Sequence, residues 1–402
     1  DETGVRVKFS LMPDESKLIL ANAANVGPDI AMGTQVNLAY NLALRDSVHD
    51  LTSFSDFDEF VEMYKQPGAL MPFIHDEGIY GLPETQNFNI MFYRKDIFEA
   101  MDLELPNTWD EALTLLPDLQ RFGMNFFIPL AYADSYKTTD TTVPFIYQFN
   151  GPLYEEDGLS TSIDSDRSIK AIELMTDLFT VYGLPMQVPS FYHQFRYGTM
   201  PIGIGDFGVY VQLSHAAPEI KNMWGIHLVP GIEQEDGSIN RETTGVGHGM
   251  MILKNSEKKD DAWEFLKWWM QTDVQIEFEQ TMTMTLGSEY MWNSANLEAF
   301  EHASWPEADK AVLLEQWEQL RNVPNSPSSY MLERELSNIW NKIVLSGEPV
   351  REAVDDSVLV INREMERKNY EFGYMDRYGN KIRSYPIPTL EWIVNKGYKD
   401  EE

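Results

Sequence analysis

The stretch GIYGLPETQNFNIMFYRKD, residues 78–96, decides how the chain is organised. Its second half, from Phe88 to Tyr93, is almost continuously apolar and rich in strand-forming residues, which indicates a buried strand. Directly before that strand, and directly after a proline, stand the hydrogen-bonding side chains of Glu84, Thr85, Gln86 and Asn87. Polar side chains at the entrance to a core strand predict either a capped turn or part of a binding site.

Composition limits the class of protein. A chain of 402 residues exceeds one ordinary core, so two lobes are expected. Its 31 Lys and Arg against 64 Asp and Glu give a formal net charge of −33, and such an acidic surface repels nucleic-acid phosphates and anionic lipid. There is no cysteine, which excludes disulfides, thiolate metal sites and a cysteine nucleophile. The sequence contains no run of about 18 apolar residues, which is the length that a membrane-spanning helix needs.

Strand and helix patterns alternate along the chain. Val5, Val7 and Phe9 alternate like a strand that needs neighbours, so we expect that an upstream strand and helix have been removed from this chain. A helix is predicted around residues 14–25, and GPDIAMG, residues 27–33, is predicted to be a short buried strand ending in glycine. Thr108 and Glu111 stand at capping-box spacing before a further helix. This alternation is typical of α/β sheets flanked by helices.

Six stretches follow one another in a distinctive order: GPDIAMG, IYGLPETQNFNIMFYRKDIF, NTWDEALTLLPDLQRFGM, FRYGTMPIGIGDFGVYVQLSHAAPEI, TGVGHGMMILKNSEKKDDAWEFLKWWM and SYMLERELSNIWNKIVLSGEPVREAVDDS. Together they span nearly the whole chain, and in this order they resemble family 1 extracellular solute-binding proteins. These are the sugar-capturing receptors of ABC importers, similar in layout to maltose-binding protein. Two features of the family are missing from the sequence: its first strand with a glycine-bearing loop, and the lipid-anchor cysteine.

The resemblance implies a two-lobed α/β fold of the type II periplasmic-binding-protein kind, each lobe a sheet flanked by helices, with the ligand cleft between the lobes. Lobe one would comprise residues 1–86 and 249–291, and lobe two residues 87–248 and 292–402, with hinges near 84–89, 245–249 and 287–293. The resemblance also implies an exported, monomeric protein on the bacterial cell surface without a cofactor. It would capture a sugar or oligosaccharide for the membrane subunits of an ABC transporter, without catalysis.

In such a fold the polar residues before the core strand would lie at the hinge and face the ligand. Gln86 and Asn87 can both donate and accept hydrogen bonds from sugar hydroxyls, and Glu84 can accept two. Aromatic side chains such as Trp292 and Tyr330 suit the apolar faces of pyranose rings, although both also suit a core. The expected ligand-binding residues are Glu84, Gln86, Asn87, Phe88, Thr34, Gln35, Asp206, Phe207, Tyr210, His248, Trp292, Tyr330 and Arg334. For His248, a role in stabilising the crossover turn is the other interpretation.

Two other functions have to be weighed. Gly203, Gly205 and Gly208 match the dinucleotide fingerprint G-x-G-x-x-G, but Asp206 would face a pyrophosphate with like charge. A glycoside-active enzyme with paired cleft carboxylates is the alternative to a binding protein, because the chain has so many acidic residues. No metalloprotease motif, phosphate-binding loop or serine elbow accompanies them, and DRYGNKIRSY, residues 376–385, predicts a hairpin turn rather than a calcium loop.

Overall fold

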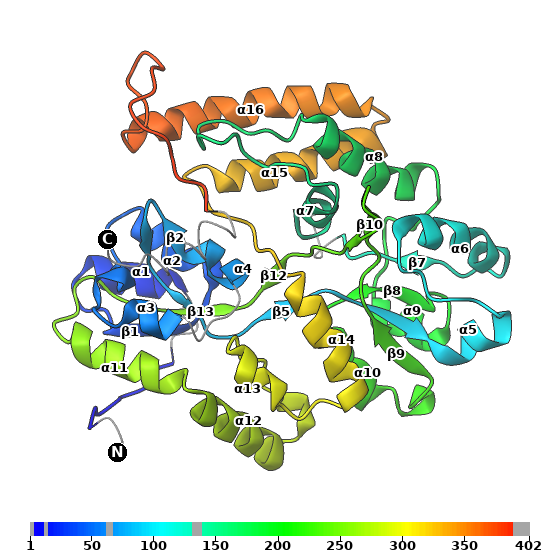
Figure 1. The fold of residues 1–402 in the computed structure, drawn as a ribbon, viewed down its shortest axis with the longest axis horizontal. Coiled ribbons are helices and arrows are strands. Elements are labelled where there is room, and N and C mark those ends of the chain that lie inside the picture. The colour runs from blue at the N-terminus through cyan, green and yellow to red at the C-terminus, as the bar shows by residue number, and fades with distance from the viewer. Residues whose placement is uncertain (1–3, 12–14, 62–66, 131–138, 389–402) are drawn as a thin grey trace.

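The computed structural model describes residues 4–11, 15–61, 67–130 and 139–388. Figure 1 shows two lobes side by side, with extended segments passing between them. The first lobe is built around a three-stranded sheet of order β1-β13-β4, in which both pairings are antiparallel. Its elements are α1 (Glu15–Ala23), β1 (Ile30–Gln35), α2 (Val36–Ala43), η1 (Leu51–Ser53), α3 (Phe57–Val61), α4 (Pro67–Leu70), η2 (Met71–Phe73), β2 (Ile74–His75), β3 (Gly78–Ile79), β4 (Leu82–Pro83), β13 (His248–Ile252), α11 (Lys259–Trp269), α12 (Thr272–Leu286) and η4 (Ser288–Tyr290).

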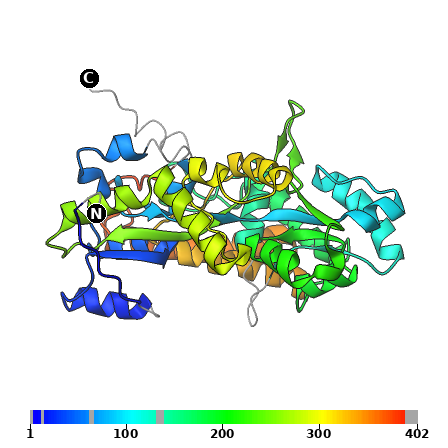
Figure 2. The ribbon, with the colours of Figure 1, turned by 90° about the horizontal axis from the view of Figure 1, so that it is seen from below.

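The second lobe contains a four-stranded sheet of order β7-β8-β6-β9, in which only β7 and β8 run parallel. Figure 2, seen from below, shows helices on both sides of the strands. The elements are β6 (Ile90–Arg94), α5 (Lys95–Met101), α6 (Trp109–Arg121), β7 (Phe126–Phe127), α7 (Thr139–Gln148), α8 (Asp166–Thr180), α9 (Phe191–Tyr197), β8 (Ile202–Gly205), α10 (Phe207–Ala216), η3 (Pro218–Ile220), β9 (Trp224–His227), β10 (Ile232–Glu233), β11 (Ile239–Asn240), α13 (Leu297–Glu301), α14 (Glu307–Glu318), α15 (Ser329–Trp340), the π-helical η5 (Asn341–Leu345) and α16 (Val350–Glu371).

Each lobe has its own buried apolar core. In lobe one the core unites side chains from α2, the central sheet and α11, and Trp263 packs there against Phe54, Phe57 and Phe60. In lobe two, one cluster lies among α6, α7, α8, α15 and α16, and another surrounds Trp317. The predicted capping box is confirmed, since the Thr108 hydroxyl accepts from the Glu111 backbone and the Glu111 carboxylate accepts from the Thr108 backbone.

Two expectations for lobe one were wrong. Residues 5–9 form no strand, and Phe9 is largely exposed, because these residues pair with no strand in the part of the chain that the structure describes. The strand predicted to end at Gly33 continues to Gln35. Gly33 adopts a positive φ of 64° at a shift in register between Ala31 and Thr34, so the glycine forms a bulge inside the strand rather than its end.

The strand predicted from Phe88 to Tyr93 is divided at Asn89. On one side, β5 (Asn87–Phe88) pairs with β12 (Gly245–Val246) in a two-stranded ribbon between the lobes. On the other side, β6 pairs with β8 and β9 inside lobe two. The chain therefore changes partners at Asn89. We name residues 84–89 the crossing segment, and Asn89 marks its entry into lobe two.

After α16 the chain returns towards lobe one. The predicted hairpin turn is confirmed, with an antiparallel bridge between Met375 and Lys381. We name residues 374–385 the C-terminal strap. Its Lys381 binds Asp157 of lobe two at 3.1 Å, while Arg383 binds both carboxylate oxygens of Asp76 in lobe one. The strap thus contacts both lobes.

Candidate functional site

Three segments of the chain lie side by side where the lobes meet. β5 pairs with β12, and Thr85 forms an antiparallel bridge with Ser294. The backbone N–H of Gln86 donates to the Asn293 carbonyl at 3.0 Å. The approach is close, because a Cβ atom on Gly247 would stand only 1.9 Å from the Thr85 carbonyl oxygen. Glycine is therefore required at this crossing.

Glu84 is anchored in lobe one and is 4% exposed. Its Oε2 accepts from the Gly33 backbone N–H at 2.8 Å, and its Oε1 accepts from the Trp269 indole at 3.0 Å. Burial raises the pKa of the Glu84 carboxyl, and these two hydrogen bonds oppose that rise. Because each carboxylate oxygen already has a donor, Glu84 is positioned to hold the crossing segment to β1 and α11.

Exposure alternates along the crossing segment as it does along a strand. Glu84, Gln86 and Phe88 are buried, whereas Thr85, Asn87 and Asn89 are partly exposed. Gln86 is 2% exposed and donates through Nε2 to the Asn87 carbonyl at 3.2 Å. The ring of Phe88 packs edge-on against Phe207 and Trp317 in the lobe-two core. Of the polar residues first singled out, the structure thus leaves Thr85 and Asn87 partly exposed.

Asn87 lies against the start of α10. Its Nδ2 is 3.5 Å from Oδ2 of Asp206, and its Oδ1 accepts from the Phe207 backbone N–H at 3.2 Å. Asp206 is the N-cap of α10 and accepts from the Val209 N–H at 3.3 Å, which explains why an aspartate ends the glycine-rich loop. The structure therefore brings Asn87 and Asp206 together.

The aromatic residues next to Asp206 point into the lobe. The Phe207 ring contacts Phe300 and Trp305 in the core. Tyr210 packs on Trp305 and donates from its hydroxyl to Asp309 at 2.6 Å. Burial raises the pKa of the Tyr210 hydroxyl. Both rings belong to the lobe-two core.

The predicted residues Thr34, Gln35 and His248 lie on the paired strands β1 and β13 of the lobe-one sheet. The His248 side chain is exposed, with Nδ1 3.3 Å from the Thr85 hydroxyl, and its backbone N–H donates to that hydroxyl at 2.9 Å. Thr34 is buried and donates to the Gly249 carbonyl, whereas Gln35 is exposed and its N–H donates to Glu15. His248 is thus the member of this group that lies beside the partly exposed Thr85.

Three predicted residues lie in other surroundings. The Trp292 indole donates to Gln275 at 2.7 Å, and its ring packs against Trp269 and Phe278 in an aromatic cluster beside α11 and α12. Tyr330, on α15, donates to Glu364 of α16. The Arg334 guanidinium binds its neighbour Glu335 at 3.1 Å. The contacts of Tyr330 and Arg334 are therefore between or within the two long helices.

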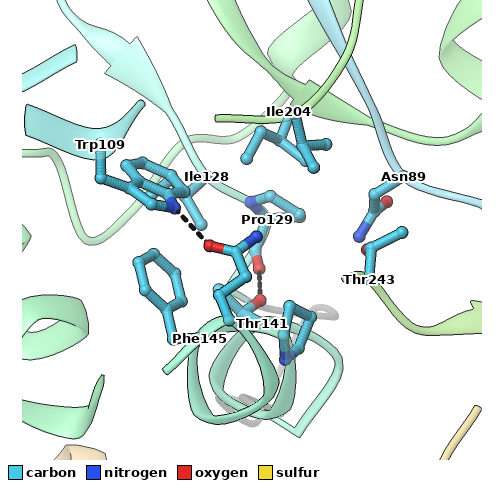
Figure 3. A pocket seen from close by; sticks show the side chains of 11 residues that line it. Asn89, Trp109, Ile128, Pro129, Thr141, Phe145, Ile204 and Thr243 are labelled. Atoms are coloured by element: carbon cyan, nitrogen blue, oxygen red, sulfur yellow. Dashed lines mark hydrogen bonds between the residues drawn. The ribbon is translucent and has the colours of Figure 1, made fainter. Parts of the chain in front are cut away.

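A cavity of about 30 Å³ opens beside the crossing segments on the lobe-two side. Figure 3 shows Asn89 and Thr243 together on one side of it, opposite Trp109 and Phe145. Among the described residues, neither the Asn89 amide nor the Thr243 hydroxyl has a hydrogen-bond partner. The sequence interpretation missed both residues. The period-two pattern from Thr85 through Asn87 leads directly to Asn89 and could have identified it.

Metal sites and membrane-spanning helices are both lacking in the described ranges. No group of three or more His, Asp or Glu side chains in them is arranged to hold a metal ion. In the same ranges, no helix has the length and apolar character needed to cross a membrane.

The chain matches known proteins along most of its length. Residues 1–276 match the model of the bacterial extracellular solute-binding proteins. A binding protein of Brucella abortus is 24% identical over 282 residues, which is 66% of this chain and 65% of that protein. The chain thus spans somewhat less than two thirds of that relative.

Solved structures share the fold. The sugar-binding protein MalE from Xanthomonas citri has a TM-score of 0.73 at 18% identity, covering 89% of both chains. An ABC transporter solute-binding protein from Thermotoga lettingae, bound with α-D-tagatose, has a TM-score of 0.66 at 18% identity, covering 87% of this chain and 88% of the other. The two-lobed α/β architecture expected from the sequence is confirmed by these likenesses. With a family match over more than half of its residues, the chain belongs to the bacterial extracellular solute-binding proteins.

Proposed function

We propose that this protein binds a sugar or oligosaccharide where the lobes meet and presents it, chemically unchanged, to the membrane subunits of an ABC transporter. The observation that carries the proposal is the pairing of Asn87 with Asp206, which brings a partly exposed amide from the crossing segment against a carboxylate from lobe two. An amide that donates and accepts, beside a carboxylate that accepts, matches the mixed donor and acceptor character of sugar hydroxyls.

The similar structures support this choice of solute. One of them is a sugar-binding protein and another is an ABC transporter protein bound with tagatose. We further propose that the protein acts as a monomer on the bacterial cell surface. Its lobes, residues 1–86 with 249–291 and residues 87–248 with 292–402, would then close around the solute by bending near 84–89, 245–249 and 287–293.

The proposed ligand contacts follow the placement of the side chains. Asn87, Asp206, Asn89, Thr243 and His248 are the residues that we propose contact the solute. Glu84, Gln86 and Thr34 instead position the crossing strands through their hydrogen bonds. The core rings of Phe88, Phe207 and Tyr210 support the start of α10 from within lobe two.

A thermal-shift screen against mono-, di- and oligosaccharides, with amino acids and polyols as comparison solutes, tests the function. A saccharide at about 100 times its dissociation constant stabilises the native state by about 2.7 kcal/mol. For any hit, calorimetric titration of Asn87→Ala should show about five-fold to 100-fold weaker binding, since a ligand hydroxyl loses its partner.

Asn338→Ala is a matched control, because Asn338 is also a partly exposed asparagine but bonds Glu335 on α15. It should bind like the wild type. Chromatography should recover the saccharide intact after incubation. The proposal would be contradicted if amino acids stabilise the protein and no saccharide does. Release of shortened sugars would also contradict it.

A further inference from the structure

We propose that the solute carries a methyl-sized apolar group, such as the methyl of an N-acetylamino sugar or of a 6-deoxy sugar, and that this group enters the cavity behind Asn89 and Thr243. This inference rests on the proposed sugar-binding function and narrows it to a class of saccharide.

The cavity has the size and walls for such a group. Its volume of about 30 Å³ exceeds the roughly 10–15 Å³ that one water-sized group needs, so a methyl group fits inside it. The walls include the buried apolar side chains of Trp109, Ile128, Phe145, Ile204 and Val229. A small cavity with such walls favours an apolar occupant over a polar one.

The polar groups on the inner wall of the cavity, away from Asn89 and Thr243, are already engaged. The Gln148 amide accepts from the Trp109 indole at 3.0 Å and donates to the carbonyls of Pro230 and Glu242 at 3.2 and 3.3 Å. The Thr141 hydroxyl donates to the Pro129 carbonyl. A hydroxymethyl group whose hydroxyl reached this inner wall would find these partners taken, so the hydroxyl would lose hydration without replacement.

The available polar groups stand instead at the crossing segments. Asn89 and Thr243 line the cavity without hydrogen-bond partners among the described residues, and Figure 3 shows them together on the side opposite the aromatic wall. Asn89 follows Asn87 by two residues, a Cα separation of roughly 7 Å along an extended chain, so both side chains lie on the same face of the segment. A sugar ring bonded at Asn87 can therefore direct a substituent past Asn89 into the cavity.

The test uses calorimetric titration of matched sugars. Each common hexose is compared with its N-acetylamino and its 6-deoxy counterpart of the same configuration, as free sugars and within disaccharides. At least one substituted series should bind about ten-fold or more tightly than its parent, because a buried methyl gains and a buried hydroxyl loses affinity. Which series is preferred identifies the substituent.

Two variants fill the cavity. Val229→Ile adds one methylene to the cavity wall. It should reduce the preference for the substituted sugar over its parent to about two-fold or less, while the parent sugar still binds. Val181→Ile, at an exposed valine, is the control and should keep the full preference. If Val229→Ile melts early, Ile204→Phe fills the cavity from β8 and provides the same comparison.

The outcomes are distinguishable. Parent and substituted sugars that bind equally well, or a preference that survives both filled variants, would overturn the cavity assignment and leave the sugar-binding function standing. If no saccharide of any kind binds, the proposed function fails and this inference fails with it.

Discussion

The indole N–H of Trp269 donates to a carboxylate oxygen of Glu84 at 3.0 Å, and this bond ties the crossing segment to the last residue of α11. The other carboxylate oxygen receives the Gly33 backbone N–H at 2.8 Å. One buried side chain therefore joins the crossing segment to the central sheet and to a helix of lobe one.

Glu84→Gln should destabilise the protein at acid pH and less at neutral pH. An amide offers only one acceptor oxygen, so either Gly33 or Trp269 loses its partner, at a cost of about 1–3 kcal/mol. Burial raises the pKa of Glu84 above its ordinary value of 4.5, so the folded protein holds the proton more tightly than the unfolded chain. The tighter binding of this proton stabilises the folded protein fully at pH values below the ordinary carboxyl pKa. The stabilisation is lost as the pH rises through the raised pKa of Glu84 in the folded protein.

Denaturant titrations of both proteins between pH 3.5 and pH 8, a range of roughly one unit below to several units above the ordinary carboxyl pKa, measure the difference. The wild type should lose stability relative to Glu84→Gln as the pH rises. Glu364→Gln is a control with the opposite sign, because Arg367 lowers the pKa of Glu364 to about 2. A difference between wild type and Glu84→Gln that is constant with pH would contradict the role of burial.

Gly247→Ala should disturb the crossing of the strands. The new Cβ would meet the Thr85 carbonyl oxygen at 1.9 Å, so the backbone between β12 and β13 must move away from the crossing segment. We expect a loss of about 1–3 kcal/mol or more from this overpacking. Gly27→Ala is the comparison, because its nearest backbone neighbours lie at 3.3 Å and need to yield only slightly. Equal melting temperatures for the two variants would show that the crossing adapts to the extra atom.

Much of the fold could be predicted from the sequence because its signals are local. The capping box at Thr108 and the turn at residues 376–385 depend on neighbours within a few residues, and both were confirmed. The family resemblance carried by the ordered motifs also implied the two-lobed architecture, which the similar solved structures confirm. The strand expected at residues 5–9 does not form, because a strand needs a partner and residues 5–9 pair with none among the described residues.

The candidate site was harder to predict because it depends on which way side chains face. Gln86 and Asn87 are adjacent and chemically alike, but alternation buries Gln86 and leaves Asn87 partly exposed. The roles of Tyr210 and Phe207 depend on the distant Trp305, with which both pack. No local pattern specifies such long-range contacts.

Asp206 should contribute to both stability and binding. Asp206→Ala removes the N-cap of α10, at a cost of about 0.5–2 kcal/mol, and also removes the carboxylate beside Asn87. Asp206→Asn keeps a good capping residue, so it should melt close to the wild type while binding the saccharide about five-fold or more weakly. Ser165→Ala removes the cap of α8 and should lower stability alone. Thermal melts and calorimetric titrations of the three variants decide this, and an Asp206→Asn protein with wild-type affinity would remove Asp206 from the proposed contacts.

The last prediction concerns the C-terminal strap. The hydroxyl of Tyr385 lies 3.0 Å from the hydroxyl of Tyr40 in lobe one, and both side chains are buried. The Tyr385 backbone N–H donates to the Asp157 carbonyl of lobe two at 2.9 Å, so this one residue contacts both lobes. Tyr385→Phe leaves the Tyr40 hydroxyl without this partner and should cost about 1–3 kcal/mol.

Tyr378→Phe is the matched control, because Tyr378 belongs to the same strap but is 72% exposed, and it should change stability by less than about 0.5 kcal/mol. Hydrogen exchange adds a local measurement. In Tyr385→Phe the amide of residue 385, which is bonded to Asp157, should exchange faster than in the wild type, while the amides of β6 in the lobe-two sheet should be protected as before. If Tyr385→Phe melts and exchanges like Tyr378→Phe, the contact between Tyr385 and Tyr40 does not hold the strap to lobe one. The ion pair of Arg383 with Asp76 is then the contact to vary next.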